Sequence, residues 1–342
     1  MDKPSRRAAL AASAAALIAT PARSTANARR LRVAIVQMAS ANRDIAGNLA
    51  RAEAYAAEAT ARGARLVLFP ELMPSGYSLW YDIWDSAEPA DGPTSRWLAA
   101  TSKRLRTWLG TSFLEASGDD FFNTFVMTGP DGREAGRVRK QVPADAEAYF
   151  FKGEIGSHVI ETAIGRIGVG ICAENYYCFL ANQMSARQVD LVLMPHSAPD
   201  CSASGGLPAA PGTHLALWYA HRLGVPVAFV NKVGGWTTRT LNPPPPETRG
   251  FFPGLSAIVD GDGAVLVSMD GQPGIGVADV SFDPGRKAPP GVVCSGIGIA
   301  ELAIGGAAGA AAVTRTQAAG SAAYLANDAR ARRARAISAG AR

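Results

Sequence analysis

The sequence predicts an α/β protein in which two mixed β-sheets pack face to face and helices cover their outer faces, an α-β-β-α sandwich. β-Branched and apolar runs alternate with helix-length segments along the chain, which is typical of strand–helix–strand units. Short turns rich in glycine and aspartate join further pairs of strands into hairpins. Because this pattern occurs once in each half of the chain, we expect two sheets within one domain.

The first half opens with a β-branched strand, followed by a helix whose alanine and leucine residues recur at helical spacing. Gly63 is expected to end this helix. The uninterrupted apolar run 66–69 predicts a strand that is covered on both faces, and the turn 129–132 predicts a hairpin. The expected strands are 31–37, 66–69, 107–113, 123–128 and 133–138, and the expected helices are 48–61 and 95–105.

The second half repeats this order and ends in a hairpin around the turn 260–263. The proline-rich stretch 240–246 is expected to be a stiff loop. The loop 201–208 is either a lid over a site or a tolerated insertion. The expected strands are 165–171, 190–194, 225–230, 256–259 and 264–268, and the expected helices are 179–187 and 214–223.

The N-terminal residues 1–28 have the composition of a cleavable export signal. They combine the pair Arg6-Arg7, a weakly apolar alanine-rich stretch and the small-x-small sequence Ala26-Asn27-Ala28. The paired arginines resemble a twin-arginine signal. We therefore expect the twin-arginine export machinery as a partner, a mature protein that is periplasmic or secreted, and no stable membrane insertion.

Residues 29–290 are expected to form the folded domain, and residues 291–342 a tail rich in glycine, alanine and arginine. The tail has few large apolar side chains, so we expect it to be disordered or docked on a partner subunit. The formal net charge of +5 comes from basic residues in the two ends, and the body between them is net acidic. A nucleic-acid partner is therefore not expected.

The four cysteines, Cys172, Cys178, Cys201 and Cys294, are spaced too widely to indicate a disulfide scaffold, and the spacing matches no common zinc pattern. Cys172 is expected to be a free thiol, and a disulfide among the other three is left open. The sequence shows no metal cluster, no phosphate-binding glycine loop and no cofactor fingerprint. We therefore expect no metal and no cofactor.

Three expected strands end at reactive side chains. Glu71 follows the buried strand 66–69, where a partly desolvated carboxylate is a candidate general base. Lys140 ends a hairpin strand, and its ammonium is expected to favour a thiolate and to stabilise an oxyanion. Cys172 lies in the turn after the strand 165–171. A thiol, a carboxylate and an ammonium together suit covalent acyl transfer.

These motifs occur in an order that resembles the nitrilase superfamily of carbon–nitrogen hydrolases, over roughly residues 31–285. The resemblance rests on Phe69-Pro70-Glu71-Leu72 with Gly76-Tyr77, on Arg139-Lys140 with Pro143, on Gly168-Val169-Gly170-Ile171-Cys172, and on the later segments 194–198, 231–234 and 254–260. It implies that Glu71 is the base, Lys140 the oxyanion stabiliser and Cys172 the nucleophile. The backbone N–H of Ala173 would be a second oxyanion donor.

The family often places a second glutamate after the lysine, where it orients the ammonium. Glu147 is our choice for this role, with Asp145 and Glu154 as competing acids. The four histidines invite a Cys–His dyad, but Glu71 and Lys140 already fill the roles that it would have. Substrate-binding candidates near the strand ends are Tyr77, Phe151, Asn175, His196 and Trp236, with Phe251 as a weaker choice.

The expected reaction is hydrolysis of a small non-peptide amide through a thioester. The alternative is a nitrilase that converts a nitrile to a carboxylic acid and ammonia. Cys172-x-Glu174-Asn175-Tyr176 resembles the nitrile-cleaving branch, but Ala173 stands where that branch usually has tryptophan. A non-catalytic binding protein on the same fold is a third, weaker alternative. The resemblance also implies a homo-oligomer, a dimer or larger.

Overall fold

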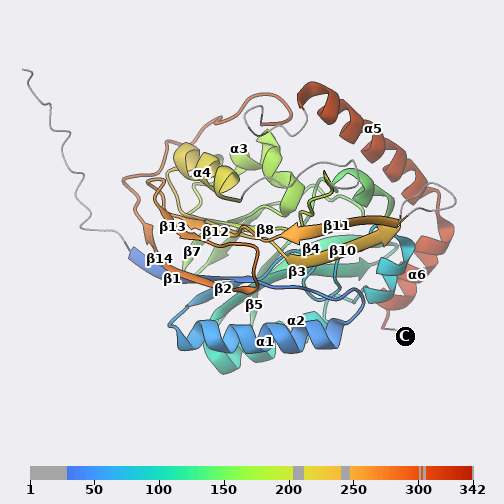
Figure 1. The fold of residues 1–342 in the computed structure, drawn as a ribbon, viewed down its shortest axis with the longest axis horizontal. Helices are drawn as coiled ribbons and strands as arrows, with labels where there is room; N and C mark the ends of the chain where they lie inside the picture. The colour runs from blue at the N-terminus through green and yellow to red at the C-terminus, as the bar shows by residue number, and fades with distance from the viewer. Residues whose placement is uncertain (1–28, 203–211, 240–246, 300–301, 303–305, 341–342) are drawn as a thin grey trace, which may run out of the picture.

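The computed structural model describes residues 29–202, 212–239, 247–299, 302 and 306–340. Two six-stranded mixed sheets pack face to face, and a two-stranded ribbon lies beside them (Figure 1). The predicted α-β-β-α sandwich of two mixed sheets is confirmed. The export signal expected at 1–28, the stiff loop at 240–246 and most of the loop 201–208 lie outside the described residues.

The first sheet has the order β14-β1-β2-β3-β4-β5. Its three central strands, β1, β2 and β3, run parallel, whereas β14, β4 and β5 pair antiparallel to their neighbours. Its strands are β1 (Arg29–Gln37), β2 (Leu66–Leu68), β3 (Trp108–Ser117), β4 (Asp120–Thr128), β5 (Glu134–Arg139) and β14 (Gly274–Phe282).

The second sheet has the order β13-β12-β9-β8-β7-β6, with β7, β8 and β9 parallel. Its strands are β6 (Val159–Thr162), β7 (Gly165–Val169), β8 (Leu191–Pro195), β9 (Val227–Val230), β12 (Ala257–Val259) and β13 (Val265–Ser268). The ribbon consists of β10 (Val233–Arg239) and β11 (Glu247–Pro253). The sequence patterns did not predict β6, β14 or this ribbon.

Four helices cover the outer faces of the sandwich. In Figure 1, α1 (Ile45–Ala61) and α2 (Pro93–Leu105) lie below the sheets, and α3 (Cys178–Ala186) and α4 (Gly212–Leu223) lie above them. Short helical turns are η1 (Tyr81–Ser86), η2 (Asp145–Tyr149) and η3 (Cys172–Tyr176). Among the described residues, no helix combines the length and the apolar composition needed to cross a membrane.

Successive residues of the central strands point into different cores. On β2, Leu66 and Leu68 pack between the two sheets, and Val67 packs under α1 and α2. On β8, Leu193 packs between the sheets and Val192 under α3 and α4. Because side chains alternate across a strand, a continuous apolar run is what a strand buried on both faces requires.

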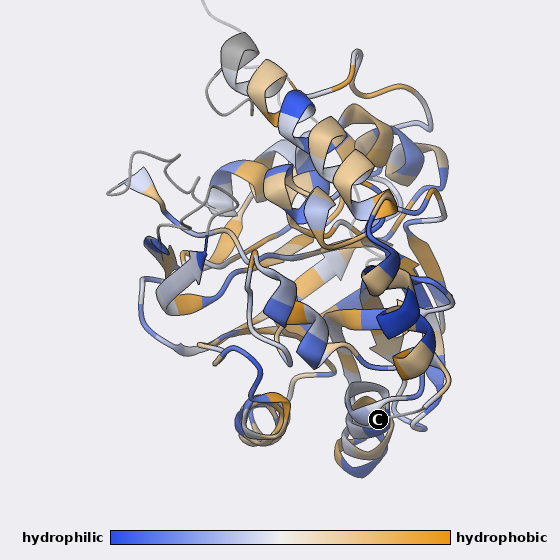
Figure 2. Ribbon diagram, turned by 90° about the vertical axis from the view of Figure 1, so that its right-hand side faces the viewer, coloured by the Kyte–Doolittle hydropathy of each residue, from blue (hydrophilic) through white to orange (hydrophobic). Residues whose placement is uncertain are grey.

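The C-terminal tail, for which disorder or docking on a partner subunit was expected, contains two helices in its described part. It forms α5 (Gly306–Leu325) and α6 (Asp328–Ser338), which pack against η2 and against β3 and β4 of the same chain. Figure 2 shows both helices on the side of the molecule that faces the viewer. Tyr324 and Arg330 are buried there, so a few specific contacts replace the broad apolar face that the tail lacks.

Cys178 and Cys294 form a disulfide, and Cys172 is a free thiol, as expected. Cys201 is also free. The disulfide ties the beginning of the tail to the start of α3. In the same region, Ile299 N–H donates to the Tyr176 carbonyl at 2.8 Å, so this segment covers the outer side of η3.

Candidate active site

Glu71 lies directly after β2 and is fully buried between the two sheets. Its Oε1 accepts hydrogen bonds from Asn123 Nδ2 at 2.7 Å and from Lys140 Nζ at 2.8 Å. Its Oε2 accepts one from the backbone N–H of Ser197 at 2.8 Å. Both carboxylate oxygens are therefore held in place, as a buried charge requires.

Lys140 follows β5 and is 1% exposed. Besides Glu71, its Nζ donates to Glu147 Oε2 at 2.7 Å. Burial lowers the pKa of Lys140, but the charges of Glu147 and Glu71 prevail and raise this pKa well above its usual value. Lys140 is therefore an ammonium between two carboxylates at neutral pH.

Glu147 lies on η2. Of the three candidate acids, Glu147, Asp145 and Glu154, it is the one whose carboxylate accepts a hydrogen bond from Lys140. Its Oε1 accepts from the Tyr77 hydroxyl at 2.8 Å, and its Oε2 also accepts from Ala144 N–H at 2.7 Å. Burial raises the pKa of Glu147. Of the competing acids, Glu154 binds Arg139 at 2.8 Å near the surface.

Cys172 begins η3 directly after β7, with a φ of 53° that strains a residue other than glycine. Its side chain is buried. Burial raises the pKa of the thiol, and the negative charge of Glu71 raises it further. Lys140 opposes this shift without outweighing it. Lys140 thus acts in the expected direction, towards the thiolate, but burial and the neighbouring carboxylates outweigh it.

Glu174 links the cysteine turn to the lysine loop, a role that the sequence reasoning missed. Its Oε2 accepts from Ile171 N–H at 3.1 Å, and its Oε1 accepts from Val142 N–H at 3.3 Å and from Gln141 N–H. His158 Nε2 lies 3.1 Å from the same Oε1. The acidic residue two positions after Cys172 was the available signal, but its partners depend on the tertiary fold.

Lys232 is a second buried cation that the sequence reasoning did not single out. It is 1% exposed, and its Nζ donates to the Leu72 carbonyl at 3.0 Å. Leu72 has a φ of 45°, so this bond supports a strained turn next to Glu71. Burial lowers the pKa of Lys232 to about 7, although Glu71 and Cys172 oppose this.

Three of the predicted substrate-binding residues lie in one aromatic cluster. Trp236 Nε1 donates to the Tyr77 carbonyl at 2.8 Å, and the two rings are 6.0 Å apart. Phe151 packs in the same cluster. Phe252 also belongs to it, whereas Phe251 is 49% exposed. Strand β11 of the ribbon therefore places Phe252 in this cluster, and not Phe251, which was our weaker choice.

Asn175 and His196 support the cysteine turn from behind. Asn175 Nδ2 donates to the carbonyls of Gly170 and Cys172 at 2.8 and 3.0 Å and lies 3.1 Å from His196 Nε2. Burial, with a smaller contribution from the charge of Lys140, lowers the pKa of His196 to about 3. Ala173 is partly exposed, and as the second residue of a helical turn it has no acceptor for its N–H within that turn.

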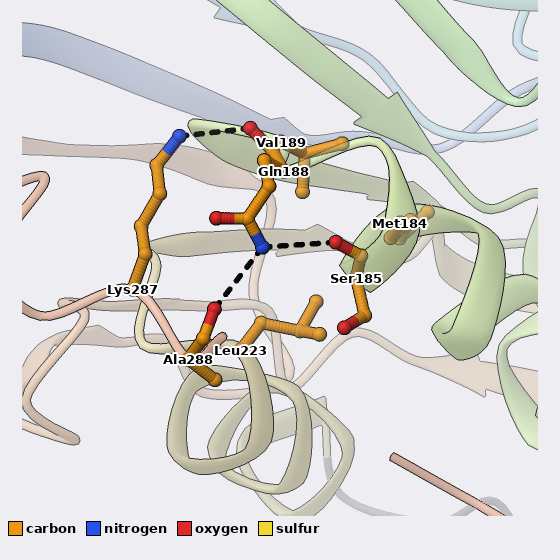
Figure 3. Close-up of a pocket in the computed structure, with 7 residues that line it drawn as sticks. All are labelled: Met184, Ser185, Gln188, Val189, Leu223, Lys287 and Ala288. Carbon is orange, nitrogen blue, oxygen red and sulfur yellow. Dashed lines mark hydrogen bonds between the residues drawn. The ribbon is translucent and has the colours of Figure 1, made fainter. Parts of the chain in front are cut away.

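A small, shallow pocket lies away from these residues, between α3, α4 and the segment 287–288 (Figure 3). Gln188 Nε2 bridges it by donating to the carbonyls of Ser185 and Ala288 at 2.9 and 3.0 Å. Lys287 Nζ donates to the Gln188 carbonyl at 2.8 Å. These polar groups are already paired within the protein, which identifies a packing gap rather than a ligand site. No group of three metal-ligating side chains occurs in the described part of the chain.

Residues 32–289 match the family model described as carbon-nitrogen hydrolase. A bifunctional nitrilase/nitrile hydratase from Lupinus angustifolius is 29% identical over 72% of this chain and 74% of its own. An N-carbamoylputrescine amidase from Arabidopsis thaliana is 26% identical over 71% and 83%. The crystal structure of an amidase from Nesterenkonia sp. is 25% identical, covers 74% of this chain and 91% of its own, and has a TM-score of 0.62. The chain belongs to the carbon–nitrogen hydrolase family, within the nitrilase superfamily, and is an enzyme of that type.

Proposed function

We propose that the protein hydrolyses a small non-peptide amide through a covalent thioester on Cys172. Glu71 is the general base, Lys140 stabilises the oxyanion, and Glu147 orients Lys140. The observation that carries this proposal is the fully buried arrangement Glu71–Lys140–Glu147, whose charges act on a free thiol held in a strained turn. A buried charge network of this kind is costly to build and is typical of catalytic sites.

The raised pKa of Cys172 determines how attack begins. Since the thiol is protonated at rest, Glu71 takes its proton as Sγ attacks the amide carbon. The negative charge that develops on the amide oxygen is stabilised by the Lys140 ammonium and by the N–H of Ala173. The C–N bond then breaks, Glu71 passes its proton to the leaving nitrogen, and ammonia or an amine departs.

Hydrolysis of the thioester uses the same groups in reverse. Glu71 takes a proton from a water molecule, whose oxygen attacks the thioester carbon. The C–S bond breaks, the proton returns to sulfur, and a carboxylic acid is released. Lys140 stays charged while Glu71 carries a proton, because Glu147 remains a carboxylate 2.7 Å away. Tyr77 keeps Glu147 in place by its 2.8 Å hydrogen bond.

The amide reading is supported by amidases among the relatives and the solved structures. A nitrile substrate is the second candidate, because the lupin relative is a nitrilase/nitrile hydratase and shares 29% identity. Sulfur attack on a nitrile uses the same three groups, so the site chemistry serves either substrate. The substrate that is turned over separates the two: an amide panel and a nitrile panel are each assayed for ammonia release, and the acid is identified by mass spectrometry.

The decisive variant is Cys172→Ala in the protein that lacks residues 1–28. We expect it to abolish turnover while circular dichroism and thermal unfolding stay like those of the wild type. Cys201→Ala is the matched control, because Cys201 is the other free cysteine, and it should keep full activity. Iodoacetamide should inactivate the enzyme in step with labelling of Cys172. Full turnover by Cys172→Ala would reject the mechanism, and ligand-induced thermal shifts without turnover on either panel would favour the non-catalytic binder.

The periplasmic or secreted location and the homo-oligomer remain proposals as well. The pair Arg6-Arg7 and the alanine-rich stretch support export, and the disulfide Cys178–Cys294 suits an oxidising compartment. Cell fractionation tests export, since Arg6→Lys with Arg7→Lys should hold the protein in the cytoplasm. Light scattering after size-exclusion chromatography measures the oligomer.

A further inference from the structure

Helix α5 lies beyond the residues that match the family model, yet it packs directly on the turn that carries Glu147. The contact depends on Gly320, which is buried against η2. A Cβ at this position would meet Tyr149 Cδ2 at 2.8 Å and the carbonyl carbon and Cβ of Ala148 at 2.9 Å. The glycine therefore permits a close approach of two backbones that any larger residue would push apart.

Gln317 lies one turn earlier on α5, and its side chain forms hydrogen bonds with two separate segments next to the candidate site. Its Nε2 donates to the Pro143 carbonyl at 2.8 Å, within the loop between Lys140 and Glu147. The same atom lies 3.3 Å from the hydroxyl of Tyr177, the residue that directly follows η3. One side chain thus spans the lysine loop and the end of the cysteine turn.

The far end of the helix pair is anchored on the β3–β4 hairpin. The Tyr324 hydroxyl accepts a hydrogen bond from Phe121 N–H at 2.8 Å, and Arg330 forms an ion pair with Asp120. At the near end, the disulfide of Cys294 holds the preceding segment on α3. With both ends fixed to the body, α5 has a defined position over η2.

From these contacts we infer that α5 is a positioning element for the catalytic machinery, and that Gly320 and Gln317 are positioning residues that act through Glu147. The inference rests on the proposed function, because it gives Glu147 its role in orienting Lys140. Glu147 reaches Lys140 over 2.7 Å, so a displacement of η2 by a fraction of an ångström weakens this contact. Misplacement by about 1 Å can cost a hundredfold in rate.

The first test is Gly320→Ala, which adds one methyl group at the closest contact. Alanine favours a helix more than glycine does, so lost activity would not come from a weaker helix. We expect kcat to fall about tenfold or more, with KM nearly unchanged, because the change displaces a group that acts on the transition state. The matched control is Ala318→Leu, a larger addition on the exposed side of the same helix, which should leave kcat unchanged.

A second variant avoids steric strain. Gln317→Glu keeps the shape of the side chain but removes the N–H donors, so it loses the bond to the Pro143 carbonyl. We expect the same kind of kcat loss, and Gln317→Lys, which restores a donor, should recover part of it. Thermal unfolding of each variant separates loss of positioning from loss of fold.

Coupling to Glu147 distinguishes a positioning role from general stabilisation. The rate of Cys172 alkylation is measured against pH in the wild type, Gly320→Ala, Glu147→Gln and the double variant. We expect Gly320→Ala to shift the pH profile in the wild-type background and to have no effect once Glu147 is replaced. Equal effects in both backgrounds, or unchanged kcat in Gly320→Ala, would overturn the inference. If Cys172→Ala retained full turnover, the proposed function itself would fail, which is a different result.

Discussion

Ser197 holds Glu71 through two hydrogen bonds that cross from one sheet to the other. Its backbone N–H donates to Glu71 Oε2 at 2.8 Å, and its Oγ donates to the Glu71 carbonyl at 2.7 Å. Glu71 follows β2 of the first sheet, and Ser197 follows β8 of the second. The position of the proposed base therefore depends on how the two sheets pack.

Ser197→Ala tests this link. It removes the bond from Oγ and leaves the buried Glu71 carbonyl with one partner fewer, while the backbone N–H still binds Oε2. We expect the free energy of unfolding to fall by about 1–3 kcal/mol and kcat to fall about tenfold. Urea unfolding and steady-state kinetics measure the two effects. Ser202→Ala, at an exposed position, should change neither, and wild-type behaviour of Ser197→Ala would show that the link is dispensable.

Glu147→Gln tests how Lys140 stays charged. Glu147 is the largest contributor among the charges that raise the pKa of Lys140, so its neutralisation should lower this pKa. Because the ammonium form is the active one, the alkaline limb of kcat/KM should move to lower pH, and kcat should fall by about 10²–10³. Glu154→Gln is the control, since Glu154 binds Arg139 instead. An unshifted alkaline limb in Glu147→Gln would argue against this role.

His196 should make the protein sensitive to acid. Burial lowers the pKa of His196 to about 3 in the folded protein, from 6.5. Between these values the unfolded chain binds a proton that the folded chain cannot bind. Stability from this group is therefore complete above pH 6.5 and is lost as the pH falls towards 3, by about 1.4 kcal/mol per unit.

The measurement is the free energy of unfolding against pH for the wild type and for His196→Gln, which accepts the bond from Asn175 but does not titrate. The difference between the two proteins should change steadily from pH 6.5 to 4 and stay constant above pH 7. His221→Gln, at an exposed histidine, should follow the wild type. Parallel curves for the wild type and His196→Gln would contradict the proposed burial of a neutral imidazole.

The proximity of Glu71 and Lys140 was predictable, because both follow expected strands, whereas Glu147 was chosen from the resemblance to the family. The sandwich brings the ends of these strands together. Ser197 and Lys232 were not predictable in the same way. Their bonds to Glu71 and Leu72 cross between segments that are far apart in the chain, and only the packing of the two sheets determines them.

The position of the C-terminal tail was also not predictable from the sequence. Its alanine-rich composition gives no apolar stripe from which a docking face can be read. Its position depends on single contacts, such as the close approach at Gly320 and the buried ring of Tyr324. A small residue in an alanine-rich helix carries little information until its neighbour in space is known.

The disulfide Cys178–Cys294 should contribute strongly to stability. It closes a loop across a sequence separation of 116 residues, and the loss of unfolded-chain entropy for such a loop is worth about 4–5 kcal/mol, with measured values usually nearer 2–4 kcal/mol. We expect the double variant Cys178→Ser with Cys294→Ser to lose about 2–4 kcal/mol in urea unfolding. The reductant dithiothreitol should destabilise the wild type equally and leave the double variant unchanged, and Cys201→Ser should behave like the wild type. Equal stability of the wild type and the double variant under oxidising conditions would show that the hydrogen bonds from the segment 291–299 to η3 and α3 suffice to hold this segment in place.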